Sequence, residues 1–203
     1  TRAWAQQLRA MSQNDQDYIT RLLAWFHDQP FYYTLHPPKM TGADGIDTFL
    51  FRERRGFCAH YASAFAFMMR AVGIPARIVA GYQGGEVNPL GHYLQVRQYD
   101  AHAWVEVWLP GQGWVREDPT AAVAPARVED GLFAALRDAG EAAGASALTQ
   151  WQNGGLLARI GMMGDYMNYL WQRWVLNYDQ SSQQALFKQW FSWATLLRVL
   201  LGA

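Results

Sequence analysis

The stretch Gly56-Phe57-Cys58-Ala59-His60-Tyr61 contains the single cysteine of this 203-residue chain. Gly56 interrupts regular structure, and the residues from Cys58 onward favour a helix up to the stop signal Gly73-Ile74-Pro75. We therefore predict a helix over residues 58–71 with Cys58 in its first turn. In that position, unpaired backbone N–H groups and the positive end of the helix dipole stabilise a thiolate over a thiol. Two interpretations stay open here: a reactive thiol, or a buried cysteine that only fills space.

Two amphipathic helices are predicted before this stretch. Apolar residues recur every three or four positions in residues 4–11 and again in residues 15–26. Residues 31–35 are aromatic and β-prone, and the prolines after them favour an extended exit. Asp44 then caps a short predicted helix. The three arginines of Arg52-Glu53-Arg54-Arg55 would favour a thiolate through their charge, or they form a solvated turn.

After residue 75 the hydrophobic period changes from that of a helix to that of a strand. The predicted strands are residues 76–82, 93–97, 101–109 and 114–117. Gly- and Pro-rich sequence at residues 84–91 predicts a loop, and Pro110-Gly111-Gln112-Gly113 predicts a hairpin turn. Connections this short imply an antiparallel sheet packed against the cysteine helix, which is an α+β fold.

The C-terminal part of the chain has a different amino-acid composition. Residues 121–146 are rich in Ala and Gly and predict a loop with short helical pieces, whereas residues 165–178 and 181–201 predict two aromatic helices. The last of these is too polar to span a membrane, but its aromatic and leucine content suits a segment near one. We expect a catalytic domain over residues 1–130, including the N-terminal helices. A helical, membrane-proximal extension packed on the core is expected over residues 131–203.

Charge and composition argue against several classes of protein. The 17 basic and 17 acidic residues balance, so nothing resembles a nucleic-acid-binding surface or an acidic tail. Half of the residues are apolar and 15% are aromatic, which suffices for a folded core. The ten tryptophans exceed the need of such a core, so some are expected to line a groove or face a partner. The sequence begins at Thr1 without a signal-like segment, and we interpret it as a fragment.

A base and an orienting carboxylate for Cys58 are predicted on neighbouring strands. An activated cysteine needs a base to accept its proton and a third group to fix the tautomer of that base. His102 opens the strand at 101–109, and Asp118 follows the strand at 114–117. An antiparallel hairpin makes His102 and Asp118 direct or diagonal neighbours, within side-chain reach. We therefore predict Cys58, His102 and Asp118 as the catalytic residues.

Other residues compete for these roles. His60 follows Cys58 by two helical positions and points roughly 200° away, which makes it a poor base. His92 lies in a Gly- and Pro-containing loop without a carboxylate partner of obvious register. Glu106 shares the strand face of His102 and competes with Asp118 as the orienting group. A metal site is disfavoured, because Cys58 and these histidines lack paired ligand spacing.

Several local motifs together resemble the core of the transglutaminase-like superfamily. They are Gly56-Phe57-Cys58, Gly73-Ile74-Pro75-Ala76-Arg77, Gly81-Tyr82, Ala101-His102-Ala103-Trp104-Val105-Glu106-Val107, and Gly113-Trp114 through Asp118-Pro119-Thr120. The resemblance spans about residues 45–130. It extends more weakly through residues 31–38 to a bacterial branch whose transglutaminase-like domain lies outside the inner membrane, between transmembrane segments. Ala59 departs from the acidic residue that relatives often carry, which affects thiolate tuning or substrate contacts.

The resemblance implies a papain-like α+β core with the nucleophile helix on an antiparallel sheet and additional N- and C-terminal helices. It implies that Cys58 attacks a glutamine carboxamide, that ammonia leaves, and that a lysine amine or water resolves the thioester. His102 would act as base and then acid, and Asp118 would orient it. The backbone N–H of Cys58 is one expected oxyanion donor. The second is an aromatic side chain within residues 31–33 or a tryptophan.

The implied partners are protein or peptide substrates that supply the glutamine and the amine. No cofactor and no metal are expected. The implied location is the periplasm, in a domain of an inner-membrane protein. Two alternatives stay open: a cysteine peptidase or amidase acting on peptides, including those of the cell wall, and a non-enzymatic interaction domain that has kept the fold.

Overall fold

The computed structural model describes residues 1–40, 42–132, 135 and 156–172. The chain divides into two compact units. The first consists of Thr1–Val87 and Leu94–Asn153, and the second of Asn88–Tyr93 and Gly154–Ala203. The cysteine helix and the main sheet both belong to the first unit.

Helical elements form the N-terminal part of the first unit. They are α1 (Arg2–Ala10), α2 (Asp15–Asp28), α3 (Gly45–Thr48) and the π-helical turn η1 (Phe49–Glu53). Asn14 caps α2 by accepting a hydrogen bond from the backbone N–H of Asp17 at 2.9 Å. The turn η1 ends at Arg54, whose φ of 53° is left-handed. The predicted helices are therefore present. Asp44 is the N-cap residue of α3 but its side chain makes no capping hydrogen bond, and the helix changes from α to π geometry at Phe49.

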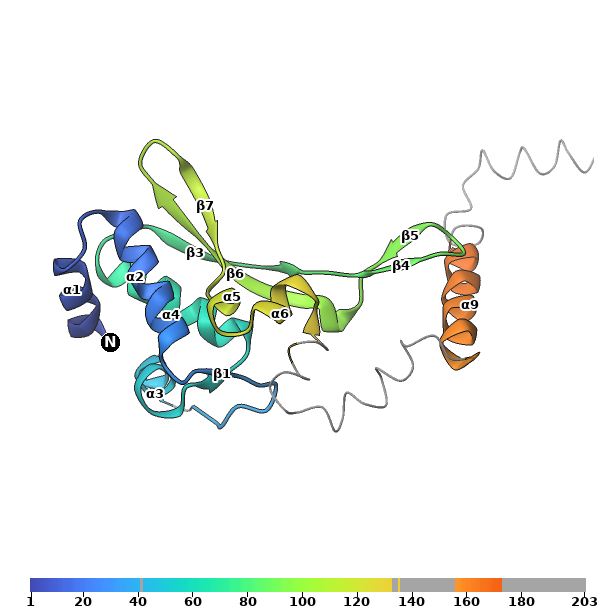
Figure 1. Ribbon diagram of the computed structural model, residues 1–203, viewed down its shortest axis with the longest axis horizontal. Coiled ribbons are helices and arrows are strands. Elements are labelled where there is room, and N and C mark those ends of the chain that lie inside the picture. The colour runs from blue at the N-terminus through green and yellow to red at the C-terminus, as the bar shows by residue number, and fades with distance from the viewer. Residues whose placement is uncertain (41, 133–134, 136–155, 173–203) are drawn as a thin grey trace, which may run out of the picture. The chain divides into compact units, whose positions relative to one another are not determined.

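A three-stranded antiparallel sheet forms the centre of this unit. Its strands, in spatial order, are β3 (Ala76–Tyr82), β6 (Ala101–Leu109) and β7 (Gly113–Glu117). In the β6–β7 hairpin, Val105 lies opposite Glu117. Gly111 and Gly113 in its turn have φ values of 79° and 82°, which residues with side chains rarely adopt. The antiparallel sheet and its hairpin are confirmed (Figure 1).

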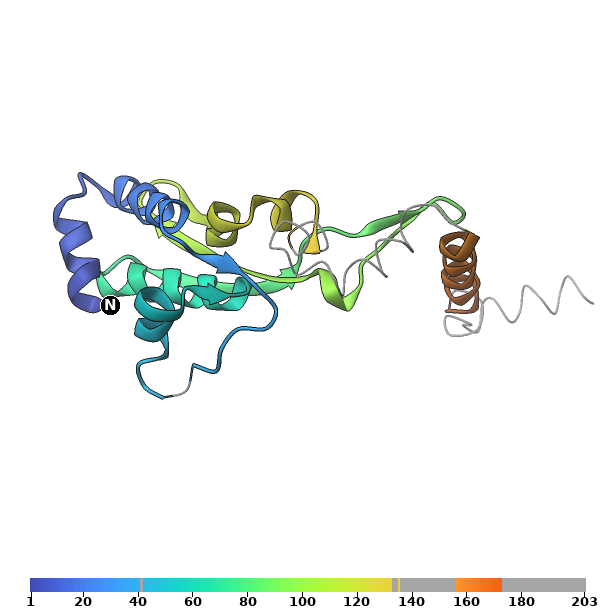
Figure 2. The same ribbon diagram turned by 60° about the horizontal axis from the view of Figure 1, so that its bottom comes forward.

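Helix α4 (Cys58–Ala71) packs against one face of this sheet (Figure 2). Val105 and Val107 of β6 are fully buried, as are Ala62 and Ala66 of α4. Helix α1 also packs on α4, and the Tyr18 hydroxyl of α2 donates to the backbone oxygen of Met68 at 3.1 Å. Because α4 is covered by the sheet and by neighbouring helices, it is apolar nearly all round. The α+β architecture follows from this packing.

A two-residue parallel ladder fixes the entry to α4. It consists of β1 (Tyr32–Tyr33) and β2 (Arg55–Gly56). Tyr33 lies opposite Gly56, and the backbone N–H of Thr34 donates to the oxygen of Gly56 at 2.9 Å. The hydroxyl of Tyr61 donates to the backbone oxygen of Tyr32 at 2.8 Å. The segment at 31–35 is therefore bound directly to the start of the cysteine helix.

Several predictions differ from the structure. The remaining elements are β4 (Glu86–Asn88), β5 (Tyr93–Gln95), η2 (Gln98–Asp100), α5 (Pro119–Val123), α6 (Pro125–Glu129) and α9 (Leu156–Trp171). Of these, α5 and α6 agree with the short helical pieces predicted from residue 121, and β5 is a shorter form of the strand predicted at 93–97. The loop predicted at 84–91 contains β4, which pairs with β5 and is concealed in the sequence by flanking glycines. Helix α9 begins at Leu156, well before the predicted start at residue 165. The prediction missed its first turns because Gly161 and Gly164 interrupt the apolar periodicity of the sequence. The helix predicted at 181–201 lies outside the described residues, and the division after residue 130 stays a prediction.

The described part of the second unit contains the turn between β4 and β5 and helix α9. Asn88 Nδ2 donates to the backbone oxygen of Met162 at 3.1 Å, and the rings of Tyr93 and Tyr169 stack at 4.5 Å between centroids. Within the described residues, no helix is both long enough and apolar enough to cross a bilayer.

Candidate active site

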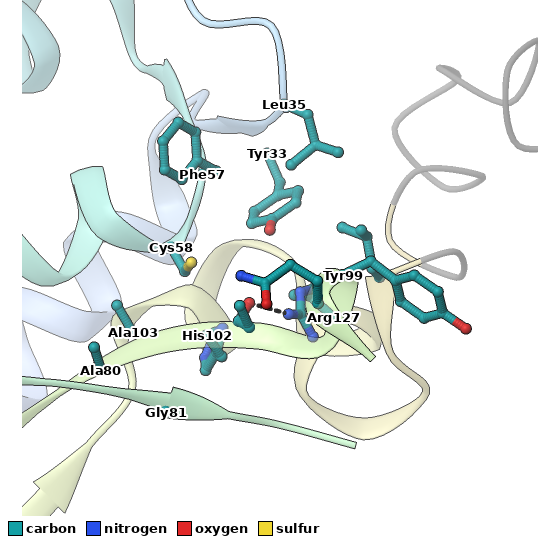
Figure 3. Close-up of a pocket in the computed structure, with 13 residues that line it drawn as sticks. Tyr33, Leu35, Phe57, Cys58, Ala80, Gly81, Tyr99, His102, Ala103 and Arg127 are labelled. Atoms are coloured by element: carbon teal, nitrogen blue, oxygen red, sulfur yellow. Dashed lines mark hydrogen bonds between the residues drawn. The ribbon is translucent and has the colours of Figure 1, made fainter. Parts of the chain in front are cut away.

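Cys58 is the first residue of α4, and its sulfur faces a pocket (Figure 3). Phe57 is the N-cap, and its backbone N–H donates to His60 Nδ1 at 3.3 Å. The backbone N–H of His60 donates in return to the oxygen of Phe57 at 2.8 Å. His60 therefore helps to cap the helix that carries Cys58, and its Nδ1 is occupied by this contact.

Gly56 allows the sharp approach of the chain to Cys58. A Cβ atom at this position would lie 2.8 Å from His60 Cβ and 2.9 Å from Phe49 Cε2. Such distances are well below van der Waals contact, so a larger residue would push α4 or η1 away. The glycine before Phe57 is thus required by packing.

His102 and Asp118 meet in a buried hydrogen bond. His102 Nε2 lies 2.7 Å from Asp118 Oδ2, and the two side chains are 0% and 9% exposed. Asp118 Oδ1 accepts a second hydrogen bond, from the backbone N–H of Thr120 at 3.1 Å, which starts α5. Arg116 Nη2 lies 3.4 Å from Oδ2. The register of the β6–β7 hairpin therefore brings the predicted histidine and aspartate together as diagonal neighbours.

This contact decides which nitrogen of His102 faces the thiol. Burial alone would lower the pKa of His102, but the hydrogen bond to Asp118 and the interaction with Cys58 outweigh it, and the pKa is raised. Burial would raise the pKa of Asp118, and the bond to His102 lowers it below its usual range. Nδ1 of His102 is buried without a hydrogen-bond partner of good geometry among the described residues. It is therefore the nitrogen that remains for the proton of Cys58.

The environment of Cys58 favours a thiolate. Burial would raise the pKa of the thiol, but interactions with His102, the backbone of Ala103 and the charge of Arg127 together lower it. His102 is close enough to Cys58 to have this effect, although the sulfur–Nδ1 contact does not reach hydrogen-bond geometry. Such contacts are often loose in the absence of substrate.

The pocket in front of Cys58 has a volume of about 430 Å³, a size suited to part of a peptide substrate. It is lined by Tyr33, Leu35, Phe57, Cys58, Ala80, Gly81, Gln98, Tyr99, Ala101, His102, Ala103, Arg127 and Leu132. The hydroxyl of Tyr33 points into it (Figure 3), and burial raises the pKa of this phenol, which keeps it protonated as a donor. Of the aromatic residues considered for the second donor, Tyr33 is the one that lines this pocket among the described residues.

The remaining sequence candidates lie in other surroundings. Glu106 forms an ion pair with Arg77 at 2.6 Å instead of contacting His102. His92 belongs to the second unit, at a left-handed position with a φ of 51°. In the described parts of the chain, no group of three or more His, Cys, Asp or Glu residues is arranged to hold a metal ion.

Sequence reasoning missed Arg127 altogether. Arg52 and Arg55 are exposed, and Arg54 lies over the ring of Phe31 at 5.7 Å. The arginine that lowers the pKa of Cys58 is Arg127, on α6. No signal marked it, because it lies in an Ala-rich segment without helical periodicity.

A helix-start thiol beside a buried His–Asp pair on an antiparallel sheet is the arrangement of papain-like cysteine acyltransferases. The family model of the transglutaminase-like superfamily matches residues 2–119, and the chain belongs to this superfamily.

Among its relatives is a protein-glutamine gamma-glutamyltransferase of Pseudomonas aeruginosa, 52% identical over 206 residues. The alignment covers 100% of this chain and 31% of that protein. The crystal structure of the periplasmic domain of TgpA from Pseudomonas aeruginosa is 61% identical with a TM-score of 0.64, covering 66% of this chain and 46% of that one. YebA, an uncharacterized protein of Bacillus subtilis, is 44% identical over 81 residues, which are 38% of this chain and 11% of YebA.

Proposed function

We propose that this chain transfers the acyl group of a protein- or peptide-bound glutamine to a primary amine, through a thioester on Cys58. The observation that carries this proposal is the buried 2.7 Å bond between His102 Nε2 and Asp118 Oδ2, which leaves Nδ1 for the thiol. The name of the 52% identical Pseudomonas relative supports the same activity. The chain spans about a third of that relative, so the proposal concerns this domain as the catalytic part of a longer protein.

The reaction begins from a thiolate on Cys58 and an imidazolium on His102. The sulfur attacks the carboxamide carbon and forms a tetrahedral oxyanion. As this intermediate collapses, the C–N bond breaks and Nδ1 of His102 gives its proton to the leaving nitrogen, which departs as ammonia. An incoming amine then attacks the thioester and passes a proton to Nδ1. The second collapse breaks the C–S bond and restores the thiolate–imidazolium pair. Asp118 holds Nε2–H throughout and stabilises the imidazolium. No cofactor takes part.

Two donors are proposed for the oxyanion. The backbone N–H of Cys58 is at a first-turn position that has no partner within the helix. The hydroxyl of Tyr33 enters the same pocket from β1. Because β1 pairs with β2 directly before Cys58, both donors are held on one rigid support.

The comparison with TgpA supports a periplasmic location, because that relative's aligned region is a periplasmic domain. We infer that this chain is the periplasmic domain of an inner-membrane protein. Its substrates are proteins or peptides on that side of the membrane, and cell-wall peptides are included in this class. Fractionation of cells that carry the full-length, tagged protein tests the membrane anchoring, and release into the soluble fraction would contradict it.

The deciding experiment for the activity supplies a glutamine-containing peptide and a labelled primary amine. Incorporation of the label with stoichiometric release of ammonia supports transfer. Deamidation or chain cleavage without incorporation refutes it. Cys58→Ala must abolish both the label incorporation and the ammonia release. Replacement of an exposed residue by alanine, Gln16→Ala, is the control and should leave both unchanged.

A further inference from the structure

Arg127 is completely buried, and it is the largest fully buried side chain in the described part of the protein. It lies on the short helix α6, which Gln83 fixes through a 3.1 Å hydrogen bond to the backbone oxygen of Val128. The side chain lines the same pocket as Cys58 and His102 (Figure 3). A permanent positive charge is thus held next to the reacting thiol and away from bulk solvent.

The hydrogen bonds of this guanidinium are incomplete. Nη2 donates to the backbone oxygen of Ala101 at 2.9 Å. Nε and Nη1 are buried and make no hydrogen bond of good geometry with the described residues, although the hydroxyl of Tyr33 is near enough to interact with the guanidinium. Buried charges in proteins are almost always paired, because an unpaired one loses its hydration without compensation. A neutral hydroxyl does not compensate a full charge, so the donors of Arg127 mark a place for an anionic acceptor, which the described residues lining the pocket do not supply.

The pocket itself offers no permanent counter-ion. None of the described residues that line it is acidic. The thiolate of Cys58 compensates part of the charge of Arg127, since Arg127 lowers the pKa of that thiol. Formation of a thioester removes the negative charge from the sulfur. The charge of Arg127 is then left without compensation during the second half of the reaction unless the bound substrate provides an anion.

We propose that Arg127 binds a carboxylate of the acyl donor, close to the glutamine carboxamide that Cys58 attacks. This proposal rests on the acyl transfer proposed above and specifies its donor. Two sources of a carboxylate satisfy it: the α-carboxylate of a C-terminal glutamine, or the side chain of an acidic residue next to the glutamine. Arginine is suited to this role because its several N–H donors match the oxygens of a carboxylate.

Alkylation of Cys58 tests the carboxylate site without requiring any transfer activity. Iodoacetate carries a carboxylate, and iodoacetamide is its neutral analogue of nearly equal size. We compare the second-order rate constant for iodoacetate at Cys58 with that for iodoacetamide. The ratio of iodoacetate to iodoacetamide should fall about tenfold in Arg127→Met relative to the wild type. Arg77→Met is the matched control, since Arg77 is exposed and pairs with Glu106, and its ratio should equal that of the wild type.

An equal ratio in folded Arg127→Met and wild type would overturn the proposal even if amine transfer is observed. Should Arg127→Met fail to fold, Arg127→Lys supplies the same comparison. Its iodoacetate-to-iodoacetamide ratio should lie below that of the wild type by less than about tenfold. In the wild type, protection of Cys58 from iodoacetamide gives a second measurement. A peptide ending in glutamine, or one with Gln-Glu, should protect at about tenfold lower concentration than its carboxamide or Gln-Gln counterpart. Whichever pair differs identifies the source of the carboxylate, and no difference in either pair refutes the site.

Discussion

Asp118→Asn is the substitution that tests the proposed chemistry most directly. The carboxylate of Asp118 accepts from the backbone N–H of Thr120 at Oδ1 and from His102 Nε2 at Oδ2, where Arg116 Nη2 also donates at 3.4 Å. An asparagine has only one acceptor oxygen where the carboxylate has two. If the oxygen keeps the bond to Thr120, its NH₂ group faces Nε2 and forces the His102 proton onto Nδ1. That tautomer cannot accept the proton of Cys58.

The size of the effect follows from the bond that is lost. A buried, charge-assisted hydrogen bond of this kind contributes about 1.5–3 kcal/mol, and each 1.36 kcal/mol corresponds to a factor of ten. The population of the thiolate–imidazolium pair at neutral pH should therefore fall about 10- to 150-fold in Asp118→Asn. The loss of the correct tautomer reduces the rate of ammonia release further.

The assay is the rate of Cys58 alkylation by iodoacetamide, measured from pH 5 to pH 10, together with ammonia release from a glutamine peptide. The alkylation profile of Asp118→Asn should move to higher pH and reach a plateau similar to that of the wild type. Glu117→Gln, the same chemical change on the preceding residue, is the control and should leave the profile in place. Superimposable profiles for folded Asp118→Asn and wild type would refute the role assigned to Asp118.

Four further outcomes are expected. Tyr33→Phe should lower kcat about 10²- to 10³-fold while alkylation of Cys58 is retained, and an unchanged kcat would exclude the hydroxyl as an oxyanion donor. Gly56→Ala places a methyl group 2.8 Å from His60 Cβ and should reduce the free energy of unfolding in urea by about 1–3 kcal/mol; a neutral result would mean that the turn relaxes. His60→Ala should cost about 1 kcal/mol of stability without moving the alkylation profile, whereas a shifted profile would give His60 a part in forming the thiolate. Because His102 holds the pKa of Asp118 below its usual range, the stabilisation is present at neutral pH and is lost as the pH falls through that lowered pKa. The difference in unfolding free energy between wild type and Asp118→Asn should therefore shrink in acid, and a constant difference would contradict this linkage.

The sequence predicts α4 and the β3–β6–β7 sheet because their signals are local. Gly56 and Gly73-Ile74-Pro75 delimit the helix, and the glycines of the β6–β7 turn fix the hairpin register. Once that register is set, His102 and Asp118 must lie close together. The catalytic roles of Cys58, His102 and Asp118 remain predictions that the experiments above address.

What the sequence does not predict depends on packing between distant segments. Arg127 is buried because α6 folds against the start of β6, where the backbone oxygen of Ala101 accepts its hydrogen bond. Neither periodicity nor a motif marks that contact in an Ala-rich segment. Tyr33 is one of several aromatic residues in its stretch, and only the pairing of β1 with β2 selects it. Long-range contacts thus decide which polar groups join a nucleophile that local rules can locate.

The ladder between β1 and β2 also governs how the site tolerates motion. Tyr33 and Gly56 are register partners, so a displacement of either segment carries the other with it. The phenol of Tyr33 and the thiol of Cys58 then move together, so the distance between them changes far less than the position of either group. Lys39, six residues after Tyr33, is exposed and is not among the residues that line the pocket. Insertions beside Lys39 are therefore an opportunity for engineering, because we expect them to leave the separation of the phenol and the thiol unchanged.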